Sequence, residues 1–340
     1  MPPIPSDFNR APDGPAIEAA ASLIAPWVRV TPVIAADLGG HPLTLKLECL
    51  QVSGTFKARG AFTRLLGAQQ AARQAGQPLP ERVVAASGGN HGIAVAQAAR
   101  AVGMAADIFV PHTAPQAKQD RLRALGATVH AQGEEYAQAL SASQAFAART
   151  GALVSHAYDQ YETLAGQGTL MREWLQQTPD LDVVLIAVGG GGLIGGIATW
   201  LEAQAEAGQR VPRLVAVESD GCPTLHDALA AGRIVDISPQ GMAADSLGAR
   251  RVGELMFPIA QRRVARSVCV TDAQIRAAQS LLWSQLRVAA EPGGACALAA
   301  ITGGAWAPQA GERVGVLVCG ANVSLSDLAE TVAVPATRPC

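Results

Sequence analysis

The pattern of apolar and polar residues divides the chain into two kinds of segment that alternate. Three short runs are rich in β-branched or other apolar residues, at positions 82–87, 105–110 and 128–132. Each run is followed by an alanine-rich stretch with helical periodicity, at positions 90–103, 114–126 and 134–151. Strands that alternate with helices are typical of βαβ units, so this pattern predicts parallel sheets flanked by helices.

The same alternation continues after Gly151, with extended runs expected at positions 152–158, 182–188 and 213–219. We therefore expect an α/β chain of two lobes, each a mostly parallel sheet flanked by helices. The smaller lobe is expected at residues 80–158. The larger lobe is expected to combine residues 1–79 with residues 159–340.

Composition limits the kinds of partner. The chain has 340 residues, of which 49% are hydrophobic and 16% charged, so it can bury a sizeable core. Its net charge is −2 and its basic residues are scattered, which disfavours nucleic acid and anionic membrane surfaces and favours a small molecule. The charge-free stretch Val183–Leu201 has the length of a membrane span, but its four consecutive glycines indicate a strand, a loop and a helix instead.

The N-terminal residues and the cysteines indicate a cytoplasmic protein. The first fifteen positions, "MPPIPSDFNRAPDGP", have neither a basic nor an apolar segment of the kind found in secretory signals. Six cysteines are far apart and form no CxxC pair, which argues against a zinc site or a redox pair. We expect reduced thiols at Cys49, Cys222, Cys269, Cys296, Cys319 and Cys340.

Lys57 raises the first question about chemistry. In the stretch Val52–Phe62, "VSGTFKARGAF", this lysine follows a phenylalanine and lies in what is expected to be the first turn of a helix. Many helices carry lysines with buried stems and solvated amines, so a surface lysine is one interpretation. A functional amine is the alternative.

Two glycine-rich segments each lie between a strand and a helix. Gly189–Gly192 has the placement in which backbone N–H groups and a helix N-terminus bind phosphate, although a close packing turn would look the same. The run lacks the GxGxxG spacing of dinucleotide sites. The second segment, "SGGNHG" at Ser87–Gly92, offers polar side chains at a helix start, where a carboxylate is favoured; a simple Asn90 cap is the alternative.

Six motifs occur in one order along the chain: "SGTFKARGA", "SGGNHG", "AGQGT" (Ala165–Thr169), "GGGGLIGG", "EPGGA" (Glu291–Ala295) and "CGAN" (Cys319–Asn322). Together they resemble the pyridoxal-phosphate (PLP) enzymes of fold type II, whose two-lobed architecture is tryptophan synthase β-like. The resemblance is to the threonine/serine dehydratase and serine racemase family in particular, and it covers nearly the whole chain.

The resemblance implies a role for each matching residue. Lys57 corresponds to the lysine that forms the Schiff base with PLP, with Phe56 beside the ring. Asn90 would reach the ring hydroxyl, Glu291 would lie near the ring, and Cys319 would face the pyridine nitrogen. The phosphate would be held by Gly189, Gly190, Gly191, Gly192 and Leu193. The substrate would contact Ser87, Gly88, Asn90 and His91.

These roles predict β-elimination of a β-hydroxy amino acid such as threonine or serine, giving a 2-keto acid and ammonia. Burial lowers the pKa of a lysine amine, so Lys57 can act as the base at Cα. A thiol at the ring nitrogen does not hold a proton there as an aspartate would. Serine racemases of the family resemble "SSGNHG", and Gly88 stands where they have a second base, which disfavours racemisation. Synthases of the β-replacement kind resemble "TGNTG" instead.

The substrate side chain is less defined than the chemistry. Many threonine dehydratases resemble "HPFD" where this chain has "HAYD" at His156–Asp159, and Tyr136 stands where racemase relatives have an arginine. Tyr136 and Tyr158 either line the pocket wall or pack between the lobes. A bulkier aromatic substrate of the phenylserine type is therefore an alternative to threonine and serine.

A cation and an oligomer are further expectations from the resemblance. Some family members bind a metal with an acid at the end of the strand that corresponds to "AVES" and a second acid six residues later. Glu218 matches the first acid, but Thr224 stands at the second position, so Glu218 is either a ligand of a divalent or monovalent cation or a plain strand-end acid. The resemblance also implies a homo-oligomer, specifically a dimer. A non-catalytic binding module is disfavoured because Lys57 is retained.

Overall fold

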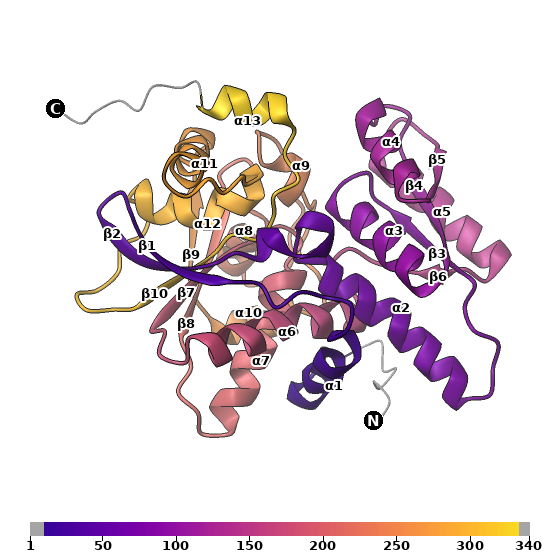
Figure 1. Cartoon of the computed structure of the whole chain (residues 1–340), viewed down its shortest axis with the longest axis horizontal. Coiled ribbons are helices and arrows are strands. Elements are labelled where there is room, and N and C mark those ends of the chain that lie inside the picture. The colour runs from indigo at the N-terminus through magenta and orange to yellow at the C-terminus, as the bar shows by residue number, and fades with distance from the viewer. Residues whose placement is uncertain (1–9, 333–340) are drawn as a thin grey trace.

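Two sheets organise the chain in the computed structural model, which describes residues 10–332 (Figure 1). The larger sheet has six strands, and only its β1–β2 pair is antiparallel. In order across the sheet the strands are β1 (Val33–Leu38), β2 (His41–Lys46), β10 (Val314–Leu317), β7 (Val183–Ala187), β8 (Arg213–Ser219) and β9 (Val264–Val270). Because β10 lies between β2 and β7, segments from both ends of the sequence meet in this lobe.

The second sheet has four strands, all parallel. In order they are β5 (Thr128–Ala131), β4 (Ala105–Val110), β3 (Arg82–Ala86) and β6 (Leu153–Val154). The helices between these strands are α3 (Asn90–Val102), α4 (Gln116–Ala124) and α5 (Tyr136–Thr150). The expected fold class of two mostly parallel sheets is thus confirmed. All four strands fall inside residues 80–158, and the lobe boundaries proposed there stay a prediction.

The remaining helices surround the six-stranded sheet. They are α1 (Gly14–Ile24), α2 (Lys57–Gln74), α6 (Tyr161–Gln177), α7 (Gly192–Glu206), α8 (Thr224–Ala231), α9 (Ala244–Leu247), α10 (Phe257–Arg263), α11 (Asp272–Leu286), α12 (Pro292–Thr302) and α13 (Leu325–Val332), with the 3-10 turns η1 (Glu48–Leu50) and η2 (Val52–Gly54). Helix α2 contacts α6 on one side and α3 on the other, so it joins the two lobes (Figure 1).

The apolar runs of the sequence form the strands that are covered on both faces. Every residue of β7 is buried, as are four of the five residues of β3. Parallel strands with helices on both faces form continuous apolar runs in the sequence, which explains why such runs located them. The run expected at 152–158 is shorter than predicted, because only Leu153–Val154 pairs with β3.

Two expectations about the whole chain can be compared with this structure. The charge-free stretch 183–201 divides into β7, the glycine loop and the start of α7, as the four glycines indicated. No helix in the described part of the chain combines the length and the apolar character needed to cross a membrane. Five of the six cysteines are free thiols, and Cys340 lies outside the described residues.

Candidate active site

Lys57 is the first residue of α2, and its side chain enters a pocket between the two lobes. Its amine donates a hydrogen bond to the carbonyl oxygen of Ala157 at 2.8 Å and lies 5.1 Å from the centre of the Phe56 ring. Burial lowers the pKa of Lys57 to about 8, against the opposing influence of Cys319 and Glu291. A substantial fraction of this amine is therefore neutral near pH 8, as a nucleophile or base must be.

The chain contains three lysines, and the other two are engaged elsewhere. Lys46 is fully buried, where its amine donates to Thr31 and Gln177 and pairs with Glu173. Lys118 lies in α4 and pairs with Asp245. Lys57 is thus the lysine whose amine opens into the pocket.

The loop before α2 fixes where Lys57 begins the helix. Ser53 and Gly54 both have left-handed backbone angles, with φ of 68° and 76°. The amide of Phe56 donates to the carbonyl oxygen of Cys319 at 3.2 Å, and the amide of Lys57 donates to the hydroxyl of Thr55 at 3.3 Å. The first bond joins the start of α2 to the segment that follows β10, and the second is local to the first turn of the helix.

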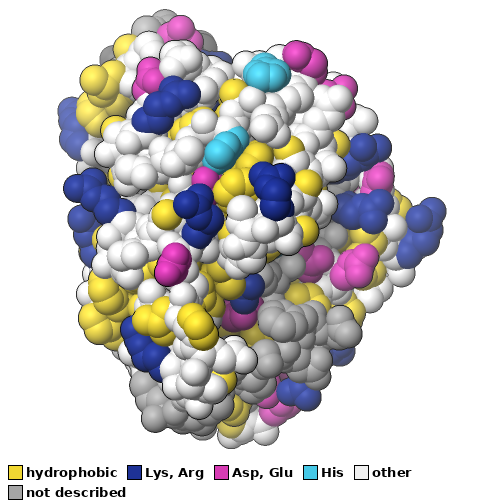
Figure 2. Space-filling model, turned by 90° about the vertical axis from the view of Figure 1, so that its right-hand side faces the viewer, with side chains coloured by type: hydrophobic (Ala, Val, Ile, Leu, Met, Phe, Trp, Pro, Cys, Tyr) yellow, Lys and Arg dark blue, Asp and Glu magenta, His cyan; other side chains and the backbone are white. Residues whose placement is uncertain are grey.

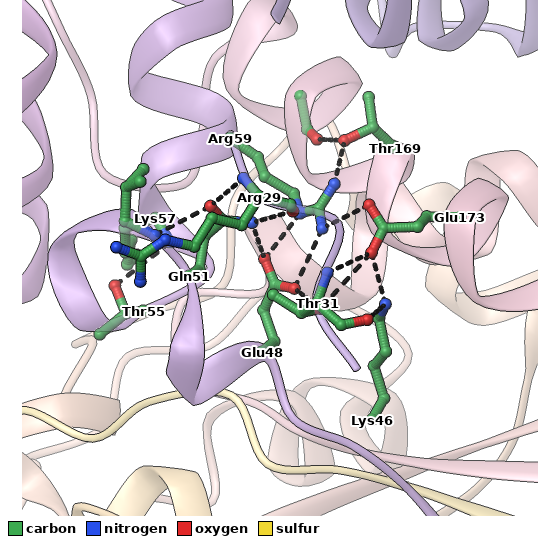
Figure 3. A network of polar contacts seen from close by, with 12 residues as sticks. Arg29, Thr31, Lys46, Glu48, Gln51, Thr55, Lys57, Arg59, Thr169 and Glu173 are labelled. Carbon is green, nitrogen blue, oxygen red and sulfur yellow. Dashed lines mark hydrogen bonds and ion pairs between the residues drawn. The ribbon is translucent and has the colours of Figure 1, made fainter. Parts of the chain in front are cut away.

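A buried cluster of charges holds the same helix two residues further on (Figure 3). The Arg59 guanidinium, 2% exposed, donates to Glu48 at 2.6 and 3.0 Å and to Glu173 at 2.9 Å. Lys46 supplies the second cation for the two carboxylates. Two cations and two anions balance, which removes the penalty of a lone buried charge. Because Arg59 binds η1 and α6 together, the cluster fixes the rotation of α2 and hence the direction of the Lys57 side chain.

Close helix packing accounts for two of the quoted motifs. A Cβ on Gly60 would lie 2.6 Å from Gln167, and a Cβ on Gly166 would lie 2.6 Å from the carbonyl oxygen of Arg59. Helices α2 and α6 can therefore pack this closely only because each has a glycine at the crossing point. The glycines of "KARG" and "AGQG" therefore serve helix packing, which positions Lys57, and neither glycine lines the pocket.

The glycine loop forms one wall of the pocket, between β7 and α7. A Cβ on Gly190 would lie 2.3 Å from the Tyr158 ring, and a Cβ on Gly189 would lie 2.8 Å from the carbonyl oxygen of Leu247. Gly191 caps α7 with a φ of +89°, which other residues rarely adopt. The loop thus brings backbone and a helix N-terminus close to the cavity, an arrangement that favours an anion.

Three polar side chains, those of Asn90, Glu291 and Cys319, also line the pocket. The Asn90 amide, at the start of α3, donates to the Glu291 carboxylate at 2.7 Å. Burial raises the pKa of Glu291 to about 7, and the Asn90 hydrogen bond opposes this change. The Cys319 thiol donates to the carbonyl oxygen of Gly293 at 3.4 Å, and burial raises its pKa strongly, so the thiol is neutral.

Both lobes contribute residues to the pocket, with Asn90 on one side and Ser246 and Leu247 on the other. Most of the residues that the sequence indicated line it, namely Phe56, Lys57, Asn90, Tyr158, Gly189, Gly190, Gly191, Gly192, Leu193, Glu291 and Cys319. Sequence reasoning missed Ala187, Val188, Ile194, Ser246, Leu247 and Gly293. Ser246 accepts a hydrogen bond from the amide of Gly293 at 3.0 Å. Gly293 lies in a motif that had been quoted, whereas α9, which carries Ser246, has no periodic signal.

The other residues expected to contact substrate do not line this cavity. Ser87 and Gly88 precede α3, and a Cβ on Gly88 would lie 3.3 Å from Val110 of β4 in the same lobe. His91 is buried with its Nε2 atom 3.1 Å from the carbonyl oxygen of Ser155, and burial lowers its pKa to about 3, so the ring is neutral. Tyr136 begins α5 and is 52% exposed. Their contact with substrate stays a prediction.

Glu218 serves as a cap for α8 in this structure. Its buried carboxylate accepts from the amides of Leu225 and His226, each at 2.7 Å, and from the hydroxyl of Ser267 at 3.4 Å. Within residues 10–332, no three His, Cys, Asp or Glu side chains are grouped as metal ligands. A cation at Glu218 stays a prediction.

The pocket fits the cofactor that the sequence resemblance implies. A phosphate would find backbone N–H groups and the α7 N-terminus at a loop whose glycines leave no room for a Cβ. The pocket offers the amine of Lys57 to an aldehyde, and it offers a pyridine nitrogen the neutral thiol of Cys319 rather than an aspartate. The donor chemistry therefore matches pyridoxal phosphate at each of its polar ends.

Comparison with known proteins agrees with this fit. Residues 24–320 match the family described as "Pyridoxal-phosphate dependent enzyme". The chain is 37% identical to phenylserine dehydratase of Ralstonia pickettii, over 95% of this chain and 97% of that protein. It is 31% identical to L-threonine ammonia-lyase of Thermotoga maritima, over 86% of this chain and 70% of the relative.

The fold is also similar to that of solved structures. Maize serine racemase superimposes with a TM-score of 0.84 at 31% identity, covering 94% of this chain and 97% of that one. The similarity therefore spans both sheets and the pocket between them. The chain belongs to the family of pyridoxal-phosphate dependent enzymes.

Proposed function

We propose that this enzyme eliminates water from a β-hydroxy amino acid and releases a 2-keto acid and ammonia. The observation that carries the proposal is the amine of Lys57, the lysine that opens into the pocket and whose pKa burial lowers to about 8. Relatives named phenylserine dehydratase, L-threonine ammonia-lyase and beta-hydroxyaspartate dehydratase support this reaction class.

The cofactor supplies the difficult part of this chemistry. Pyridoxal phosphate, when bound, is an electron sink that makes the Cα proton of an attached amino acid acidic. In our proposal Gly189–Leu193 would hold the phosphate, Phe56 would flank the ring, and Asn90 and Cys319 would contact its polar edge. Lys57 would hold the aldehyde carbon.

Lys57 then has a proton to move. Its freed amine, neutral in part near pH 8, takes the proton from Cα of the substrate. The β-hydroxyl group would leave as water with the proton that Lys57 took from Cα, and water would hydrolyse the resulting enamine to the 2-keto acid and ammonia. One water is lost and one is consumed, so the atoms balance without an oxidant or reductant.

The neutral thiol of Cys319 suits elimination. Because its pKa is raised by burial, this group offers the ring nitrogen a neutral partner rather than a negative charge. A ring nitrogen without a proton withdraws electrons from Cα less strongly. Expulsion of a good β-substituent is then favoured over reactions that need a long-lived carbanion.

An aromatic side chain on the substrate is a second candidate, which the pocket wall favours. Tyr158 lines the pocket, and the centres of its ring and the His156 ring lie 4.8 Å apart in an edge-to-face arrangement. Burial raises the pKa of Tyr158 to about 12, so its hydroxyl is neutral. A phenyl group on Cβ of the substrate could stack on such rings. The carboxylate of either kind of substrate would meet Ser87, Gly88, Asn90 and His91 at the start of α3.

Keto-acid release on a panel of amino acids tests the proposal. We expect release from L-threonine, L-serine or L-threo-phenylserine by the enzyme loaded with pyridoxal phosphate, and kcat/KM across the panel ranks the two substrate classes. No keto acid from any β-hydroxy amino acid, with the cofactor bound, would reject the reaction. We also propose a homodimer and a cytoplasmic location, which sedimentation equilibrium and cell fractionation would test.

A further inference from the structure

A chain of three hydrogen bonds crosses between the lobes beside the pocket. Arg121 of α4 donates to Oδ1 of Asn322 at 2.5 Å, and Nδ2 of Asn322 donates to Oδ1 of Asn90 at 2.7 Å. The Nδ2 atom of Asn90 donates to Oε1 of Glu291 at 2.7 Å. Arg121 and Asn90 belong to helices of the four-stranded sheet, whereas Asn322 and Glu291 belong to the other lobe. Every link therefore joins one lobe to the other.

The chemistry of the groups gives this chain a single direction. A guanidinium only donates, so the end of Asn322 that faces Arg121 has to be its oxygen. The nitrogen of Asn322 then faces Asn90, which must present its own oxygen in return. That leaves the nitrogen of Asn90 facing the pocket, where an ionised carboxylate is the acceptor. Arg121, on the surface, thus sets the orientation of both amides.

Asn322 also binds the loop that leads to Lys57. Its Nδ2 atom donates to the carbonyl oxygen of Ser53 at 3.0 Å. A Cβ on Gly54 would lie 2.6 Å from Oδ1 of Asn322, and Gly54 has a φ of +76°. The glycine of "SGTFK" is therefore required both by the turn and by the approach of this amide. The same side chain contacts the lysine loop, the pocket amide and the surface arginine.

We propose that Arg121 is a positioning residue that acts through Asn322 and Asn90 to keep Glu291 a hydrogen-bond acceptor in the pocket. The inference rests on the proposed function only in that the pocket holds pyridoxal phosphate. Arg121 itself touches neither the cofactor pocket nor Glu291. It acts because each amide in the chain has one donor end and one acceptor end.

The groups around Glu291 determine the pH at which its carboxyl group ionises. Burial raises the pKa of Glu291 to about 7; the Asn90 hydrogen bond, Lys57 and Arg121 lower it, and Asp245 raises it. The neutral Cys319 thiol also lies nearby. Glu291 is therefore ionised above about pH 7. Loss of Arg121 removes a lowering influence and frees the amides to turn, so the transition moves to higher pH.

Arg121→Gln with Arg123→Gln as its control tests the proposal. Arg123 lies on the same helix and donates to Asp120 at 2.9 Å and Gln119 at 3.0 Å, so its replacement removes the same charge without breaking the chain. The pair between Lys118 and Asp245 still joins the lobes in both variants. The readouts are the pH dependence of the absorbance of lysine-bound cofactor and of kcat/KM.

The midpoint near pH 7 should rise by roughly half a unit or more in Arg121→Gln and stay in place in Arg123→Gln. In Arg121→Lys, which keeps a donor, the midpoint should lie close to that of the unmodified enzyme. Glu291→Gln should abolish the transition. An unchanged midpoint in Arg121→Gln, an equal shift in Arg123→Gln, or no transition in the unmodified enzyme would overturn the inference. An enzyme with no lysine-bound cofactor and no keto-acid release would instead reject the proposed function.

Discussion

Replacing Gly190 by alanine is a direct steric test of the glycine loop. The added Cβ would lie 2.3 Å from Cδ1, 2.4 Å from Cγ and 2.6 Å from Cε1 of Tyr158, closer than such contacts occur. The φ of Gly190 lies outside the left-handed region, so its backbone angles add no strain of that kind. The effect of the substitution therefore comes from the collision with the Tyr158 ring.

The size of the effect follows from the cost of overpacking. Forcing an extra methyl group into a packed site costs about 1–3 kcal/mol. Tyr158 lines the pocket beside the loop, so relief of the collision displaces its ring at the expense of cofactor space. A cost of this size lowers affinity for pyridoxal phosphate by about fivefold to a hundredfold, at about 1.4 kcal/mol per factor of ten.

Titration of the cofactor-free enzyme with pyridoxal phosphate, followed by absorbance, measures this affinity. Tyr158→Ala removes the ring that the new methyl group strikes. The double variant should therefore bind more tightly than Gly190→Ala alone, with a favourable coupling of about 1 kcal/mol or more. Unchanged affinity in Gly190→Ala, or losses that simply add in the double variant, would refute the steric reasoning.

Three further predictions address the charge cluster, the buried acid of β8 and the stereochemistry. Arg59→Met should lower the free energy of unfolding in urea by about 3–5 kcal/mol, because two buried carboxylates lose their shared partner. Burial raises the pKa of Glu218 to about 8, so the stability that its protonated form contributes is lost as pH rises from about 5 through 8. The urea midpoint of unfolding should therefore fall over this pH range, and Glu218→Gln should make the fall smaller. Because Gly88 carries no second base, L-serine incubated in deuterated water should yield keto acid without comparable D-serine by chiral chromatography.

Much of the fold could be predicted because its strands are covered on both faces. Continuous apolar runs located β3, β4, β7 and β8, and the glycines separated β7 from α7. The run at 152–158 was overextended for a local reason. Nδ1 of His156 accepts the amide of Asp159 at 2.9 Å, so the chain turns there instead of continuing β6. Composition cannot distinguish such a side-chain turn from a strand.

Motifs in the sequence indicated pocket residues in loops whose backbone geometry requires glycine. Glycine at positions 190 and 191 follows from close approach and left-handed angles, which leave a trace in the sequence. Ser246 and Leu247 left no such trace, because the four-residue helix that carries them is too short to show a period. The link from Arg121 to Asn322 depends on two segments 201 residues apart meeting across the lobes.

The central claim is that Lys57 carries the cofactor, and the chain's three lysines make this claim simple to test. Borohydride reduction of the enzyme with pyridoxal phosphate bound fixes the cofactor to its lysine, and peptide mass spectrometry then locates the modified residue. We predict modification at Lys57, and none at any lysine in Lys57→Ala together with loss of keto-acid release. Modification at Lys46 or Lys118 in the active enzyme, or normal turnover by Lys57→Ala, would contradict the account.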